Sequence, residues 1–98
     1  MVEIKKKEQL IICLLDRLDA SNAEEASSIV IEAVKDLASD VLIDVSELKY
    51  ISSAGLRIVL NIAKDVKAAG KETLLQGAKG EVKEIFRISG FLTFLKEI

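Results

Sequence analysis

The sequence YISSAGL, residues 50–56, joins an apolar segment to the longest helical pattern in the chain. Before it lies VLIDV, residues 41–45, which is short, rich in β-branched residues and almost wholly apolar, as in a buried strand. After it, apolar residues recur every three or four positions, which predicts a helix that begins at Ser53 and stops at Gly70. Two hydroxyls and a glycine thus lie where a strand passes into a helix, and helix N-termini expose N–H groups that favour anions.

The rest of the chain predicts further strands and helices around this junction. The first two strands flank a charged turn at residues 5–8 and form an antiparallel hairpin, and the second is apolar enough to be buried on both faces. Ser21 or Asn22 caps the first helix, and residues 46–52 form a connection without regular structure. Expected strands are residues 2–4, 9–15, 41–45 and 72–76; expected helices are 21–37, 53–70 and 81–90, followed by a short helix or turn at 91–98. Strands alternating with helical crossovers predict one α/β domain, residues 1–98.

Composition removes several classes of function. The chain has 14 basic and 16 acidic residues without a basic patch, which argues against nucleic-acid binding. No apolar run approaches the roughly 18 residues of a membrane span, and no signal peptide is recognisable, so we expect a cytoplasmic protein. Cys13 is the single cysteine and reads as a buried structural thiol. Without histidine, neither a Cys/His zinc site nor a His-activated nucleophile can form, and no phosphate-binding glycine loop is present. We therefore expect no metal, no cofactor and no enzymatic activity.

The residues of the junction allow two interpretations of its serines. Ser52 or Ser53 can cap the following helix, or one of them can accept a phosphoryl group. Gly55 lies in the first helical turn, where glycine is unfavourable unless another backbone or a partner approaches closely. Asp44, at the end of a buried strand, leaves a third interpretation open, that of the phospho-acceptor in a response-regulator receiver.

Residues 50–57 resemble the STAS domain family, and within it the stand-alone bacterial anti-sigma factor antagonists. Residues 18–22, LDASN, are similar to the family's element before the first helix, and residues 41–46, VLIDVS, are similar to its aspartate-ending strand. Gly70 followed by a strand and a glycine-bearing loop matches the second half of the family pattern. The resemblance extends over nearly the whole chain.

This resemblance implies a four- to five-stranded mixed sheet with helices packed on one side. It also implies partner switching: the unphosphorylated protein binds an anti-sigma factor that is a serine kinase, phosphorylation releases it, and a PP2C-type phosphatase reverses the modification. The phosphorylated serine of the family stands two residues before the motif glycine, which is Ser53 here, with Ser52 as a second candidate. The expected partner contacts are Asp19, Ser21, Asn22, Ser52, Gly55, Leu56 and Arg57. The alternative is a STAS interaction module, stressosome-like or transport-associated, without a role in sigma-factor control.

Overall fold

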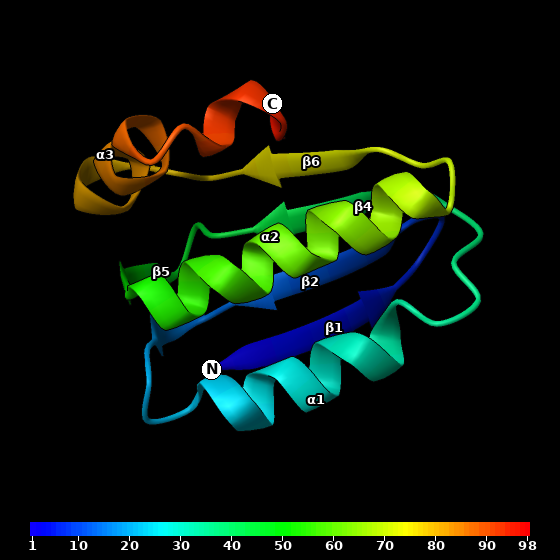
Figure 1. Cartoon of the computed structure of the whole chain (residues 1–98), viewed down its shortest axis with the longest axis horizontal. Helices are drawn as coiled ribbons and strands as arrows, with labels where there is room; N and C mark the ends of the chain where they lie inside the picture. The colour runs from blue at the N-terminus through cyan, green and yellow to red at the C-terminus, as the bar shows by residue number, and fades with distance from the viewer.

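Strands β1 (Val2–Lys6) and β2 (Leu10–Leu14) form an antiparallel hairpin in the computed structural model, which describes residues 1–98 (Figure 1). Strands β4 (Val41–Asp44), β6 (Thr73–Gln76) and β7 (Lys96–Glu97) continue the sheet beside β2 and run parallel to it. The order β1-β2-β4-β6-β7 makes a mixed sheet of five strands. The predicted class of fold is therefore confirmed.

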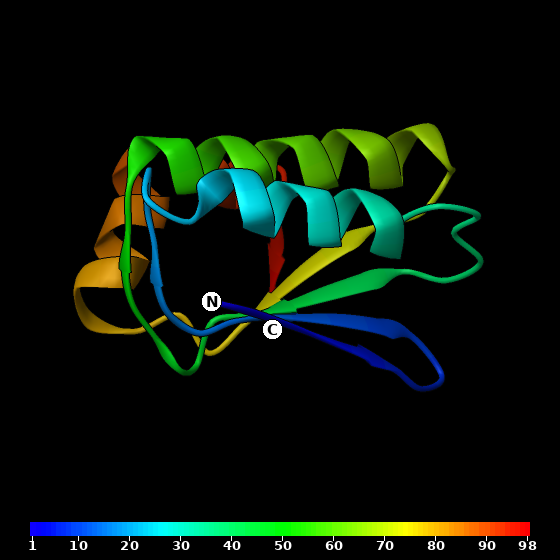
Figure 2. The same cartoon turned by 90° about the horizontal axis from the view of Figure 1, so that it is seen from below.

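Three α-helices connect these strands, and α1 (Ala23–Ala33) and α2 (Ser53–Ala68) cover one face of the sheet (Figure 2). The third helix, α3 (Gly80–Ile88), follows β6 and packs beside the end of the sheet. None of the helices combines the length and the apolar composition that a membrane crossing requires.

The core lies between the sheet and the helices. Alternate residues of a strand point to opposite faces, so Ile12, Ile43 and Leu75 of three neighbouring strands all point at the helices and are fully buried. Helix α2 meets them with Val59 and Ile62, which follow the helical spacing. On the opposite face Cys13 is 5% exposed, which confirms a buried thiol, and burial raises its pKa.

A second, two-stranded sheet is the main feature that the sequence did not predict. Strand β3 (Asp16–Leu18) pairs in parallel with β5 (Leu48–Ile51), although residues 46–52 were expected to be a connection. Both strands are very short, and their pairing joins segments about thirty residues apart, so neither carries a local signal. Asp16 has a φ of 58° where the chain bends out of β2, a conformation that aspartate tolerates better than most residues.

Other boundaries also differ from expectation. Strand β1 extends to Lys6, into the charged segment that was expected to be a turn at residues 5–8. Helix α1 ends at Ala33 and not at Leu37. Residues 34–36 form a turn, in which Asp36 adopts a φ of 52°, outside the range of a right-handed helix. Val34 and Leu37 still pack against the core, so the apolar spacing continues past the end of the helix. Residues 91–98, expected as a helix or turn, contain a 3-10 helix (Phe91–Thr93) and then the edge strand β7.

Gly55 anchors the start of α2 to this small sheet. A Cβ at position 55 would lie 2.7 Å from the carbonyl oxygen of Leu18 and 2.7 Å from Cγ1 of Ile51. The backbone N–H of Ser52 donates a hydrogen bond of 2.9 Å to the same Leu18 oxygen. The close approach expected at Gly55 is thus made by the chain's own β3 backbone.

We expect Gly55→Ala to destabilise the protein by about 1–3 kcal/mol, the usual cost of overpacking. Elsewhere in a helix alanine is about 1 kcal/mol more favourable than glycine. Exposed Asn61, in the middle of α2, offers the matched control: Asn61→Ala should be more stable than Asn61→Gly. Urea denaturation measures both pairs, and a stabilised Gly55→Ala variant would contradict the role given to this contact.

Candidate functional site: a serine at the start of helix α2

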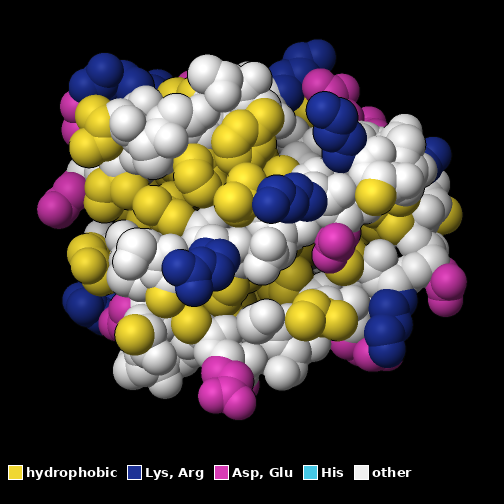
Figure 3. All heavy atoms as spheres, in the orientation of Figure 1, with side chains coloured by type: hydrophobic (Ala, Val, Ile, Leu, Met, Phe, Trp, Pro, Cys, Tyr) yellow, Lys and Arg dark blue, Asp and Glu magenta, His cyan; other side chains and the backbone are white.

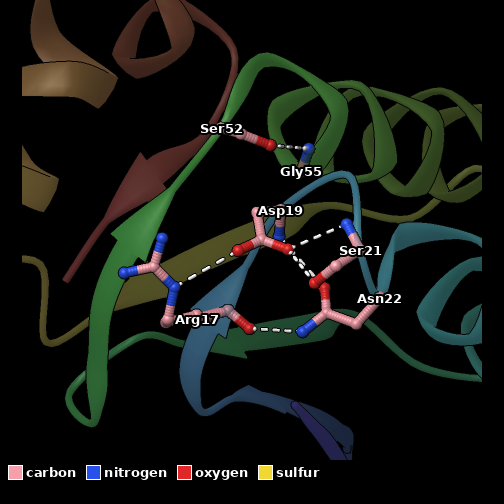
Figure 4. Close-up of polar contacts among 6 residues, drawn as sticks. All are labelled: Arg17, Asp19, Ser21, Asn22, Ser52 and Gly55. Atoms are coloured by element: carbon pink, nitrogen blue, oxygen red, sulfur yellow. Dashed lines mark hydrogen bonds and ion pairs between the residues drawn. The ribbon is translucent and has the colours of Figure 1, made fainter.

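The two adjacent serines have different environments. Ser52 is the N-cap of α2, with extended backbone angles, and its Oγ accepts a hydrogen bond of 3.3 Å from the backbone N–H of Gly55 (Figure 4). Ser53 is the first helical residue; its side chain is exposed, and no hydrogen bond engages its hydroxyl. The local fold therefore occupies one hydroxyl and leaves the next one free.

The start of α2 favours negative charge. The N–H groups of Ser53 and Ala54 have no acceptor within the helix, because the first turn has no preceding carbonyls. No acidic residue lies in this turn. An anion on the Ser53 oxygen would therefore meet free N–H donors and the positive end of the helix dipole.

The loop at Asp19 lies beside this helix start (Figure 4). The hydrogen bond from the Ser52 N–H to the Leu18 carbonyl ties the two segments together. The Asp19 carboxylate accepts hydrogen bonds from the Ser21 backbone N–H at 2.9 Å and from the Ser21 hydroxyl at 2.5 Å. Asn22 closes the loop: its side-chain oxygen accepts from the Asp19 N–H at 3.0 Å, and its amide donates to the Arg17 carbonyl at 2.9 Å.

This network corrects the expected role of Asn22. Asn22 does occupy the N-cap position of α1, but its side chain makes no capping hydrogen bond to that helix. It bonds to the loop residues before the helix, as asparagine commonly does in turns. Ser21 does not cap the helix either, because its hydroxyl donates to Asp19.

The same contacts lower the pKa of Asp19. The Ser21 hydroxyl contributes most, followed by the Ser21 N–H, with a smaller effect of Arg17, all of which favour the ionised carboxylate. A lowered pKa in the folded state stabilises the loop above the ordinary carboxyl pKa. That contribution is lost as the pH falls through the lowered pKa.

Arg17 and Tyr50 belong to the site although neither was predicted as a site residue. The Arg17 guanidinium lies 4.7 Å from the centre of the Tyr50 ring, and its Nε is 3.2 Å from the Asp19 carboxylate. Arg17 thereby links strands β3 and β5 to the loop. Tyr50 begins the YISSAGL stretch, so the sequence drew attention to it. Its contact with Arg17 could not be predicted, because it depends on the pairing of the two short strands β3 and β5.

The remaining expected contact residues divide between surface and interior. Arg57 is exposed, takes part in no ion pair, and lies one helical turn after Ser53, on the same side of α2. Leu56 is half-buried and packs against the core, and Gly55 is buried. A partner can therefore touch Arg57 directly, whereas Gly55 acts by holding the helix in place.

The side chain of Asp44 is half-buried and takes part in a local hydrogen-bonded turn. Its Oδ1 accepts hydrogen bonds from the Ser46 N–H at 2.9 Å and from the Ser46 hydroxyl at 2.7 Å, which close the turn after β4. Gly77 packs against this turn, since a Cβ there would lie 2.8 Å from the Ser46 backbone.

Comparison with known proteins identifies the family of the chain. The model of the STAS domain family matches residues 1–98. The protein BtrV of Bordetella bronchiseptica, whose name describes a candidate anti-sigma factor antagonist, is 40% identical over 84 residues, or 86% of this chain and 72% of BtrV.

Three of the solved structures that share the fold do so at low sequence identity. A STAS domain protein from Planctomyces limnophilus superposes with a TM-score of 0.88 and 15% identity, covering 98% of this chain and 87% of that one. The Bacillus anti-sigma factor antagonist SpoIIAA in its unphosphorylated form superposes with a TM-score of 0.84 and 18% identity, covering 100% of this chain and 88% of SpoIIAA. The phosphorylated form of SpoIIAA superposes with a TM-score of 0.76 and 18% identity, covering 100% of this chain and 91% of that one. Because the family model matches its whole length, the chain belongs to the STAS domain family.

Proposed function

We propose that this protein is an anti-sigma factor antagonist that switches partners through phosphorylation of Ser53. The observation that carries the proposal is the free, exposed hydroxyl of Ser53 beside the committed hydroxyl of Ser52. BtrV, which shares 40% of the aligned residues, bears the name of such an antagonist, and SpoIIAA is known in unphosphorylated and phosphorylated forms. In this function the protein is a substrate and a regulator, and has no catalysis of its own.

In the unphosphorylated state, the start of α2 and the Asp19 loop form one docking surface for an anti-sigma factor that is a serine kinase. The loop is held by its internal hydrogen bonds, so little ordering is needed on binding. Arg57 and Ser21 are exposed at this proposed surface, and Asp19, Asn22 and Ser52 are half-buried beside them.

Phosphorylation of Ser53 weakens the binding of the kinase to this surface. The Ser53 Oγ forms a bond to the γ-phosphorus of ATP as the bond from that phosphorus to the β-phosphate oxygen breaks. ADP is the leaving group, and the hydroxyl proton passes to a base of the kinase or to water. The product carries about −1.5 to −2 charges at neutral pH. The free N–H groups of the first turn hold this charge, and a partner fitted to a neutral hydroxyl would have to desolvate it, which weakens binding. A PP2C-type phosphatase hydrolyses the phosphoserine and restores the surface. We place this cycle in the cytoplasm, where ATP is available to the kinase.

Charge at position 53 should control the affinity for the kinase. We expect Ser53→Ala to bind the purified anti-sigma factor kinase as the wild type does, and Ser53→Asp to bind at least about tenfold more weakly, which is about 1.4 kcal/mol. Calorimetric titration with a non-hydrolysable ATP analogue measures both affinities. Ser28→Asp adds the same charge at an exposed position of α1 and should leave binding unchanged. Equal affinities of Ser53→Ala and Ser53→Asp for the kinase would contradict the proposed phosphorylation switch.

The acceptor itself can be identified by mass spectrometry after incubation with the kinase and ATP. We expect one phosphate, on Ser53, and none in Ser53→Ala. Ser52→Ala should still be phosphorylated, although loss of the cap costs about 1 kcal/mol of stability. Phosphate on Ser52 would reverse the roles given to the two serines, acid-labile phosphate on Asp44 would indicate a receiver, and no phosphate would favour a STAS scaffold.

A further inference from the structure

A groove of about 500 Å³ lies at the other end of α2, between its second half and the segment that follows the 3-10 helix. Leu60 and Ala63 of α2 and the ring of Phe94 form its apolar lining. Figure 3 shows hydrophobic side chains gathered between α2 and the C-terminal segment, with Lys and Arg side chains among and around them. Phe94 is 44% exposed, and its ring centre lies 5.0 Å from that of Phe91.

The polar lining of the groove is basic. Lys64, Lys67 and Lys71 line it against a single carboxylate, that of Glu72. None of the three lysines takes part in an ion pair, whereas four other lysines of the chain do. The groove therefore carries more positive than negative charge, and its three lysines have no ion-pair partner within the protein.

The requirements of folding do not account for this arrangement. Like charges three or four residues apart on a helix are unfavourable by a few tenths of a kcal/mol. The helix dipole favours Lys67, which lies in the last turn of α2, but not the placement of an exposed aromatic ring beside it. An apolar lining with a basic rim is instead complementary to a chain segment of opposite charge that carries an apolar side chain.

We propose that this groove is a second docking site, which binds an acidic protein segment anchored by an aromatic or aliphatic residue. The anchor packs on Phe94 and Leu60, and the carboxylates of the segment pair with the three lysines. A concave, partly apolar site with a few charged groups around it is suited to enclosing one anchor side chain, which favours a peptide segment as its occupant. Eleven residues of helix separate Lys64 from Ser53, or about 16 Å along the axis, so the groove is distinct from the Ser53 surface.

An NMR titration with a short acidic peptide that contains one phenylalanine tests the proposal without any kinase. We expect the amide signals of Lys64, Lys67 and Phe94 to shift and those around Ser53 to stay in place. Binding should weaken by about tenfold or more in the double variant Lys64→Glu/Lys67→Glu, and also in Phe94→Ala. It should weaken as salt is raised, because the rim charges are exposed.

The matched control is Lys7→Glu/Lys79→Glu, which changes the net charge equally at two exposed, unpaired lysines outside the groove. This control should bind the peptide as the wild type does. An equal loss in both double variants, shifts that map to another surface, or groove shifts caused by anionic vesicles and not by the peptide would each overturn the proposal. Unchanged phosphorylation of Ser53 in Lys64→Glu/Lys67→Glu would show that the two surfaces act separately, so that failure of one hypothesis leaves the other intact.

Discussion

The carbonyl oxygen of Leu18 is the point on which the candidate site depends. It accepts the N–H of Ser52, and the missing Cβ of Gly55 lets the first turn of α2 lie directly against it. This contact fixes where α2 begins relative to β3, and therefore relative to the Asp19 loop that follows β3. A larger residue at position 55 would push the helix start away from the loop, because the atoms that it would meet include backbone and cannot give way cheaply.

The contact also explains why two neighbouring serines are not equivalent. With Ser52 held against Leu18, its side chain points along the first turn and caps it, while Ser53 enters the helix with its side chain toward solvent. A cap contributes about 1 kcal/mol only while its oxygen stays available as an acceptor. A hydroxyl that caps a helix is thus less available for modification. Ser52 has the capping role, and the proposed phosphorylation falls on Ser53, whose hydroxyl is exposed.

Sequence patterns predicted the elements whose signals are local. The continuous apolar runs of β2 and β4, the helical spacing of apolar residues in α2 and the glycine at position 70 predicted elements that the structure contains. The strands β3 and β5 were missed because three or four residues paired across the chain have no periodicity of their own. The end of α1 was missed for the opposite reason, since Val34 and Leu37 keep the helical spacing and remain packed on the core outside the helix. At the site, the serines and the Asp19 loop followed from the motif, but the choice of Ser52 as cap required the backbone angles.

Helix α2 carries both proposed surfaces, and its length decides how far they influence one another. About 16 Å of helix separates Ser53 from Lys64, roughly twice the Debye length of about 8 Å at physiological ionic strength. A phosphate at Ser53 is therefore largely screened from the lysines of the groove, and its charge alone would change their affinity for an acidic segment very little. Coupling between the surfaces would need an element with two arrangements, whereas α2 is a continuous helix with Val59, Ile62 and Val66 buried along its length. Under the two proposals, the groove would therefore hold a partner segment in either phosphorylation state, and phosphorylation of Ser53 would control only the other surface.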